Sequence, residues 1–216
     1  MSSPRRSVLL IPVAVGAVLV TGCALSDDGP MTSQTRDVSA FTRVDNQDSV
    51  DVRLHVGGPQ RIQVRAGQKV IGDVKTDVRD GTLHLTFDHD SGIGGSNVVV
   101  EATVPKLTGI EASGSGDIDA DGIDADALDV RSDGSADISL DGKAQRLALS
   151  LDGSGDADAT ALTARDANVA VGGSGSARVR AQGRLDAKVD GSGDIHYRGD
   201  PALTKHVDGS GEVKAD

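Results

Sequence analysis

The feature that most constrains the fold is a glycine-rich tetrad, Gly-Ser-Gly-Asp or a close variant, that occurs six times in the second half of the chain. The intervals between successive copies are 20, 19, 20, 18 and 18 residues. Self-similarity at a period of this length is the signature of a solenoid. We therefore expect every tetrad to form one structural corner, and the first glycines of the corners are Gly114, Gly134, Gly153, Gly173, Gly191 and Gly209.

Apolar residues recur at fixed offsets on both sides of each corner. Around Gly114, for example, Ile110 and Ala112 precede the corner, and Ile118 and Ala120 follow it. This period of two predicts a strand, a corner and a second strand in every unit. Two strands per unit also fit a meander of antiparallel hairpins. Equivalent positions differ little between copies, however, which favours parallel stacking of like on like at about 4.8 Å per turn.

A turn of 18–20 residues contains about 60 Å of chain, which is enough for three short sides. The variable connections, such as 121–127 and 180–184, would form the third side. We predict an all-β fold in which a right-handed parallel β-helix of about five turns occupies residues 113–216. At the corners we expect glycine to supply a positive φ, and the aspartate to cap its own turn.

Residues 40–112 are expected to form N-terminal strands that do not repeat. Val50, Val52, Leu54 and Val56 alternate with polar residues, and Asp80-Gly81 separates two further alternating runs. Alternation indicates strands with one buried face, and Asp-Gly is a strong tight-turn signal. The glycine-rich segment 91–97 is expected to be a flexible loop.

The first 22 residues have the features of a lipoprotein signal peptide. A basic pair is followed by an apolar run of thirteen residues, too short for a membrane span, and then by Thr21-Gly22-Cys23. Residues 23–39 would be the lipidated cysteine and a polar tether. Acyl chains on Cys23, palmitate among them, would hold the protein in the bilayer. An ordinary secretory signal with a stray cysteine is the alternative, and export by the Sec or the twin-arginine route stays open.

Composition narrows the classes of partner. The net charge of −11 disfavours nucleic acid. The chain has only three aromatic residues, so platforms for stacking sugars or bases are disfavoured as well. No cofactor is indicated, and the oligomeric state is open.

The corner carboxylates are the main candidates for chemistry. Stacked turns would place them in ladders of like charge, and calcium could neutralise such ladders because its ligands are carboxylates and turn carbonyls. The weak calcium candidates are Asp117, Asp137, Asp156 and Asp194. A purely structural corner is the competing interpretation. The histidines are scattered and expected to be solvated, and no Gly-x-Ser-x-Gly elbow singles out a catalytic serine. No catalytic residue is assigned.

One known family has the same order of motifs. Phe41-Thr42-Arg43-Val44, the alternating strand from Val50, Asp80-Gly81, and Val104-Pro105-Lys106-Leu107 leading into the first tetrad follow one another in sequence. This series resembles the bacterial putative auto-transporter adhesin, head GIN domain family, a domain of unknown function, over about residues 41–216. The resemblance implies a β-helical fold behind an N-terminal β region, and it supplies no reaction.

These observations predict a lipoprotein anchored to the cell membrane on its extracytoplasmic face. We expect a non-enzymatic, adhesin-like or structural module that binds an envelope or extracellular protein or glycan, and not nucleic acid. A β-helical enzyme acting on envelope or extracellular polysaccharide is one alternative, and a calcium-stabilised scaffold is another.

Overall fold

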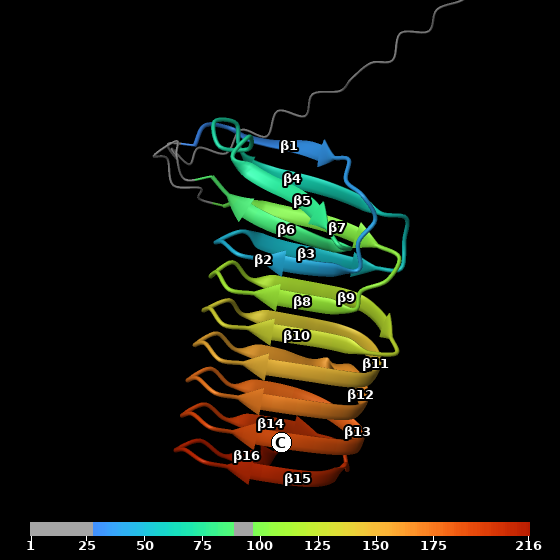
Figure 1. Ribbon diagram of the computed structural model, residues 1–216, viewed down its shortest axis with the longest axis vertical. Helices are drawn as coiled ribbons and strands as arrows, with labels where there is room; N and C mark the ends of the chain where they lie inside the picture. Colours follow the sequence, from blue (N-terminus) through green and yellow to red (C-terminus); the bar gives the residue numbers. More distant parts are fainter. Residues whose placement is uncertain (1–27, 89–96) are drawn as a thin grey trace, which may run out of the picture.

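The computed structural model describes residues 28–88 and 97–216. The predicted signal peptide, Cys23 and nearly all of the expected loop 91–97 lie outside these residues. The described part is all-β and forms one 16-stranded sheet that coils along a single long axis (Figure 1). It contains no helix long and apolar enough to cross a membrane. The strands are β1 (Met31–Arg36), β2 (Arg43–Asn46), β3 (Asp51–Val56), β4 (Arg61–Gly67), β5 (Val74–Arg79), β6 (Thr82–Phe87), β7 (Val99–Val104), β8 (Gly109–Ala112), β9 (Ile118–Ala125), β10 (Leu128–Ser132), β11 (Ile138–Leu151), β12 (Ala157–Val171), β13 (Ala177–Val189), β14 (Ile195–Arg198), β15 (Ala202–Val207) and β16 (Val213–Ala215).

The repeat forms the predicted parallel solenoid. Each strand that leads into a corner pairs in parallel with the equivalent strand of the next turn, from β8 through β10, β11, β12 and β13 to β15. The residues aligned at the last position before each corner are Ala112, Ser132, Leu151, Val171, Val189 and Val207. Their spacing equals the spacing of the tetrads, so the sequence period is the pairing register. A meander would require antiparallel pairs, which this part of the sheet does not contain.

The variable connections are strands as well. β11, β12 and β13 each run without interruption from one corner to the next and pair with their neighbours on both sides of the bend. Leu162 and Ala164 in β12, and Ala181 in β13, are fully buried at this bend. The connections therefore contribute a third side to the core, as the length of the repeat predicts.

We distinguish two outer faces of the solenoid. The groove face consists of β2, β8, β10, β15 and residues 146–151, 166–171 and 184–189, which precede corners. The back face consists of β3, β9, β14, β16 and residues 138–141, 157–160 and 177–180, which follow corners. Valine, leucine, isoleucine and alanine side chains fill the space between the faces, and nearly all are completely buried.

The N-terminal region continues the same stack, but in an order that differs from the sequence. β2 and β3 pair in parallel with β8 and β9 on one side and with β6 and β7 on the other. The turn formed by β2 and β3 therefore lies between two turns that come later in the chain. β4 and β5 pair antiparallel with β7 and β6 and close this end of the stack (Figure 1).

The expected tether is shorter than its sequence indicates. Met31–Arg36, within the segment 23–39 assigned to the tether, forms β1 and pairs antiparallel with β4 along its full length. All side chains of this strand are exposed or half-buried. The strand therefore needs no alternating apolar residues, and its sequence shows none. Backbone hydrogen bonds to β4 hold it in place, and the sequence of β1 contains no sign of that partner.

The corner glycines do not have the expected positive φ. In the described chain, positive φ values occur at six other glycines, among them Gly122 and Gly142 at bends. At a corner, glycine is required because successive turns lie too close for a side chain. A Cβ at Gly153 would lie 1.8 Å from the carbonyl oxygen of Gly134, and one at Gly173 would lie 1.9 Å from that of Gly153. A real Cβ atom needs more than 3 Å, so the backbones would have to separate.

Replacing one corner glycine tests this explanation. Gly153→Ala should lower the free energy of unfolding by about 3 kcal/mol or more, since overpacking against a rigid backbone has no easy relief. Gly72→Ala is the matched control, because a Cβ there meets nothing within 4 Å and φ is not positive. Urea denaturation of both variants measures the difference. Equal stability of the two variants would contradict the close-approach explanation.

Candidate functional site

The corner aspartates form a ladder of hydrogen bonds that runs from turn to turn. The backbone N–H of Asp156 donates to Oδ1 of Asp137 at 2.8 Å, and the N–H of Ser176 donates to Oδ1 of Asp156 at 2.7 Å. The same contact joins Asp117 to Asp137 and Asp194 to Glu212. Each carboxylate thus caps the next turn, and the expectation that it caps its own turn is wrong.

The ladder includes a turn that has no tetrad. Oδ1 of Asp51, at the start of β3, accepts the N–H of Asp117 at 3.2 Å. In the fourth copy Ser176 takes the place of aspartate, and its hydroxyl oxygen accepts the N–H of Asp194 at a longer distance of 3.3 Å. A backbone N–H is a favourable partner for a carboxylate. Repulsion between the stacked acids is therefore offset without a cation.

The weak calcium candidates are members of this ladder. Asp117, Asp137, Asp156 and Asp194 each use one carboxylate oxygen for a neighbouring turn. Within residues 28–88 and 97–216, no three histidine, cysteine, aspartate or glutamate side chains are arranged to hold one metal ion.

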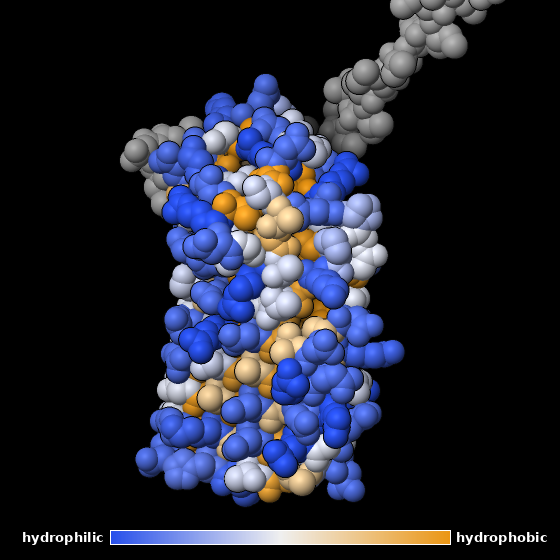
Figure 2. All heavy atoms as spheres, turned by 45° about the vertical axis from the view of Figure 1, so that its right-hand side comes forward, coloured by the Kyte–Doolittle hydropathy of each residue, from blue (hydrophilic) through white to orange (hydrophobic). Residues whose placement is uncertain are grey.

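One concave surface of the described chain is an open groove of about 1070 Å³. It crosses five turns where strands of the groove face begin, from Lys106 and Thr108 before β8 to Asp186 in β13. Small side chains line part of it: Ala125 and Ala127 lie at a bend, and Ala148 lies on the groove face. Figure 2 brings the side of the molecule with the bends forward and shows apolar atoms in a stripe along the long axis, flanked by hydrophilic side chains. The groove therefore has apolar and charged elements side by side.

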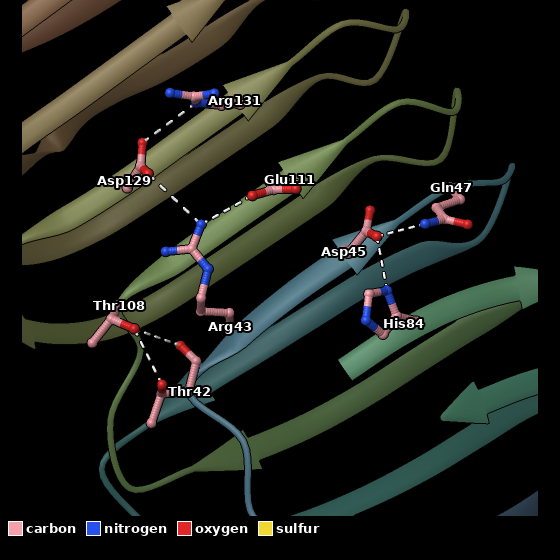
Figure 3. A network of polar contacts seen from close by, with 9 residues as sticks. All are labelled: Thr42, Arg43, Asp45, Gln47, His84, Thr108, Glu111, Asp129 and Arg131. Atoms are coloured by element: carbon pink, nitrogen blue, oxygen red, sulfur yellow. Dashed lines mark hydrogen bonds and ion pairs between the residues drawn. The ribbon is translucent and has the colours of Figure 1, made fainter. Parts of the chain in front are cut away.

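A polar network holds the N-terminal end of the groove (Figure 3). Arg43 of β2 lies across Gly109, where a Cβ would be 2.5 Å from the guanidinium group, and its Nη2 lies 3.0 Å from Glu111 and 3.7 Å from Asp129. Arg131 adds a second cation 3.8 Å from Asp129. These contacts connect three adjacent turns across the point where β2 is inserted into the stack. Such exposed ion pairs contribute little stability each, but together they position the side chains.

Beyond this network, charged groups of the groove have no partner in the described structure. Arg146, Asp166 and Arg184 are aligned in successive turns of the groove face, yet no hydrogen bond or ion pair joins their side chains to other described residues. Lys106, at the N-terminal end of the groove, likewise has no side-chain hydrogen bond or ion pair with another described residue. Cations and anions that face an open groove without internal partners are available to a ligand. The groove could therefore hold an extended partner that carries charges of both signs.

The histidines are less isolated than their sequence positions indicate. His84 lies 2.9 Å from Asp45 in the neighbouring turn, and His196 lies 2.8 Å from Asp216. The hydrogen bond from His196 holds the pKa of the Asp216 carboxyl below its usual 3.8. His55 contacts Asp121 in the same manner. These pairs join turns, and the register of β2, β3 and β14 decides which aspartate each histidine meets.

The sequence contains no periodic signal for the groove. Its charged lining residues vary from copy to copy, so they follow no period. The alanines at positions 125, 127 and 148 are the one hint, because small residues beside buried leucines leave room for a groove. The predicted corner glycines lie together along another edge of the solenoid, away from the groove.

Comparisons with known proteins agree with the architecture. The family model described as putative auto-transporter adhesin, head GIN domain, matches residues 40–201. A search of curated proteins finds no match. Among solved structures, a putative adhesin from Bacteroides fragilis has a TM-score of 0.74 at 24% identity, with 87% of this chain and 97% of that chain covered. A putative adhesin from Parabacteroides merdae (TM-score 0.60, 19% identity) and a putative lipid binding protein from Parabacteroides distasonis (0.58, 21%) have the same coverage. At these identities the similarity is one of fold.

Removing one ladder carboxylate tests its structural role. Asp156→Ala leaves the N–H of Ser176 without its acceptor, and we expect a loss of about 1–2 kcal/mol in the free energy of unfolding. Asp156→Asn keeps an acceptor oxygen and should lose less. Asp133→Ala is the control, because this exposed corner carboxylate has no hydrogen bond among the described residues, and its loss should stay within about 0.5 kcal/mol. Equal losses in Asp156→Ala and Asp133→Ala would refute the ladder.

Proposed function

The chain belongs to the putative auto-transporter adhesin, head GIN domain family, and we propose that it is a lipid-anchored, extracytoplasmic binding module that catalyses no reaction. The groove across five turns is the observation that carries this proposal. A parallel stack is a rigid support, and a rigid support lowers the entropy cost of holding an extended partner. The partner is an envelope or extracellular protein or glycan.

The charges of the groove favour binding over hydrolysis. Arg146 and Arg184 lie in the turns on either side of Asp166, so charges of opposite sign alternate along the groove. Hydrolysis of a glycan by acid catalysis needs one carboxyl group that stays protonated, usually in an apolar pocket. Interleaved charges of opposite sign suit recognition better than proton transfer.

The anchor is proposed at Cys23, which precedes the first described residue, Asp28, by five positions. Five residues reach at most about 18 Å. The end of the stack closed by β1, β4 and β5 would then lie near the membrane, and the C-terminal turns would point away. Acyl chains contribute about 0.8 kcal/mol for each buried methylene, so two or three chains hold a protein firmly in a bilayer.

A calcium-stabilised scaffold remains the alternative for the acidic corners. It requires the melting temperature to rise with calcium and to fall with a chelator. Because the ladder carboxylates already accept backbone N–H groups, we expect the same melting temperature in both solutions.

Replacing the lipidated cysteine tests the anchor. Cys23→Ala removes the only thiol of the chain and should move the protein from the membrane fraction into the soluble extracytoplasmic fraction. Ser26→Ala, three residues away, should stay with the membrane. Immunoblots of the separated fractions give the answer. A Cys23→Ala protein that still sediments with membranes would exclude anchoring by this residue.

Filling the groove tests the binding site. In the Cys23→Ala background, which removes the proposed anchor, Ala148→Trp places an indole in the groove and should weaken cosedimentation with cell-envelope preparations by about tenfold, equivalent to about 1.4 kcal/mol. Ala170→Trp is the matched control, because this alanine lies on the same face but outside the groove lining. Equal binding by the two variants would place the binding site elsewhere.

A further inference from the structure

The back face carries a column of outward side chains whose charge changes sign halfway along the solenoid. Parallel pairing aligns one residue from each of six successive turns. In order along the axis these residues are Asp119, Ser139, Asp158, Arg178, His196 and Lys214. Within these six turns the first half of the column is acidic and the second half is basic. Beyond Asp119 the column continues to Arg53 of β3 and Glu101 of β7, whose side chains lie 3.9 Å apart.

The alignment ends at the next outward positions, because bulges shift the pairing there. Asp141 pairs with Ala161, and Arg180 pairs with Thr163. Near the basic end, Asp216 contacts His196 at 2.8 Å. The polarity therefore rests on the one aligned column, which is acidic over three turns and basic over the next three.

Several of these charges have no internal partner. Asp119, Asp141, Arg178 and Arg180 form no side-chain hydrogen bond or ion pair with the rest of the described chain. Burial raises the pKa of Asp158, but hydrogen bonds from Thr160 and the charges of Arg178 and Arg198 outweigh it, so its pKa lies below 3.8. Asp158 is thus an anion at the boundary between the two halves.

We infer that the back face binds a second copy of this chain in antiparallel orientation. Consider a two-fold axis that lies parallel to the strands, between the turn of Asp158 and the turn of Arg178. Rotation about this axis reverses the order of turns and leaves the position along each strand unchanged. The column of one copy then faces the same column of the other copy, and acidic turns face basic turns. Such self-complementarity is what an isologous dimer requires.

The facing residues can be read directly from the column. Asp158 faces Arg178, Asp119 faces Lys214, and Ser139 faces His196. Every pair occurs twice because of the symmetry.

The size of the face indicates a weak and salt-sensitive dimer. Six turns at about 4.8 Å and strands of about four residues at about 3.3 Å give a face of roughly 350 Å² per copy. Stable interfaces bury about 800 Å² per partner. Association between exposed charges is screened at high ionic strength. The dimer does not depend on the proposed anchor or on the groove.

A charge swap across the two-fold axis tests the proposal. Full-length protein in non-ionic detergent is examined by sedimentation velocity at about 20 mM and about 500 mM sodium chloride, where screening lengths differ several-fold. The original protein should dimerise at low salt and dissociate at high salt. Asp158→Arg alone and Arg178→Asp alone each create two like-charged pairs and should raise the dissociation constant about tenfold or more. The double variant restores opposite charges and should return to within about threefold of the original value.

Asp133→Arg is the control for net charge, because this exposed residue lies at a corner, off the back face. It should dimerise like the original protein. Circular dichroism verifies that each variant is folded. A protein that is monomeric at low salt overturns the proposal. So does a double variant that dissociates as readily as the single variants.

Discussion

The close approach of successive backbones at the corners is the constraint on which the rest of the structure depends. Glycine is needed there because the carbonyl oxygen of the preceding turn occupies the space of a Cβ, 1.8 Å away at Gly153. The corner aspartates satisfy the N–H groups that this arrangement brings against them, at 2.7 Å for Ser176 and 2.8 Å for Asp156. Together these contacts hold the turns in one register. That register decides which outward-facing residues are aligned on the groove face and on the back face.

The turn formed by β2 and β3 shows how the same register is maintained without the tetrad. A buried Asn46 donates to the carbonyl oxygens of Val50 and Gly116, and Asp51 begins the carboxylate ladder. Arg43 extends over Gly109 and connects this turn to the next two through Glu111 and Asp129. Polar side chains thus replace glycine packing where the chain order and the spatial order differ, and the groove begins at this junction.

Both proposed binding surfaces arise from outward-facing residues, which the repeat leaves free to vary. On the groove face, small residues at the bends leave space between charged side chains. On the back face, three turns have arginine, histidine and lysine at the position where the three turns before them have aspartate or serine. We propose a partner of mixed charge for the first surface and a second copy of the chain for the other.

The sequence by itself determined the parallel stack, its period and its three sides, because a core residue must recur at the same offset in every turn that shares the core. It also indicated the family through the order of its motifs. The tertiary structure alone decided that β1 belongs to the sheet, that β2 and β3 lie between later turns, and which carboxylate caps which N–H. It also decided which charges lie side by side. The physical reason is the same in each case: backbone pairing and side-chain proximity between distant segments depend on register, and a non-periodic segment carries no sign of its partner.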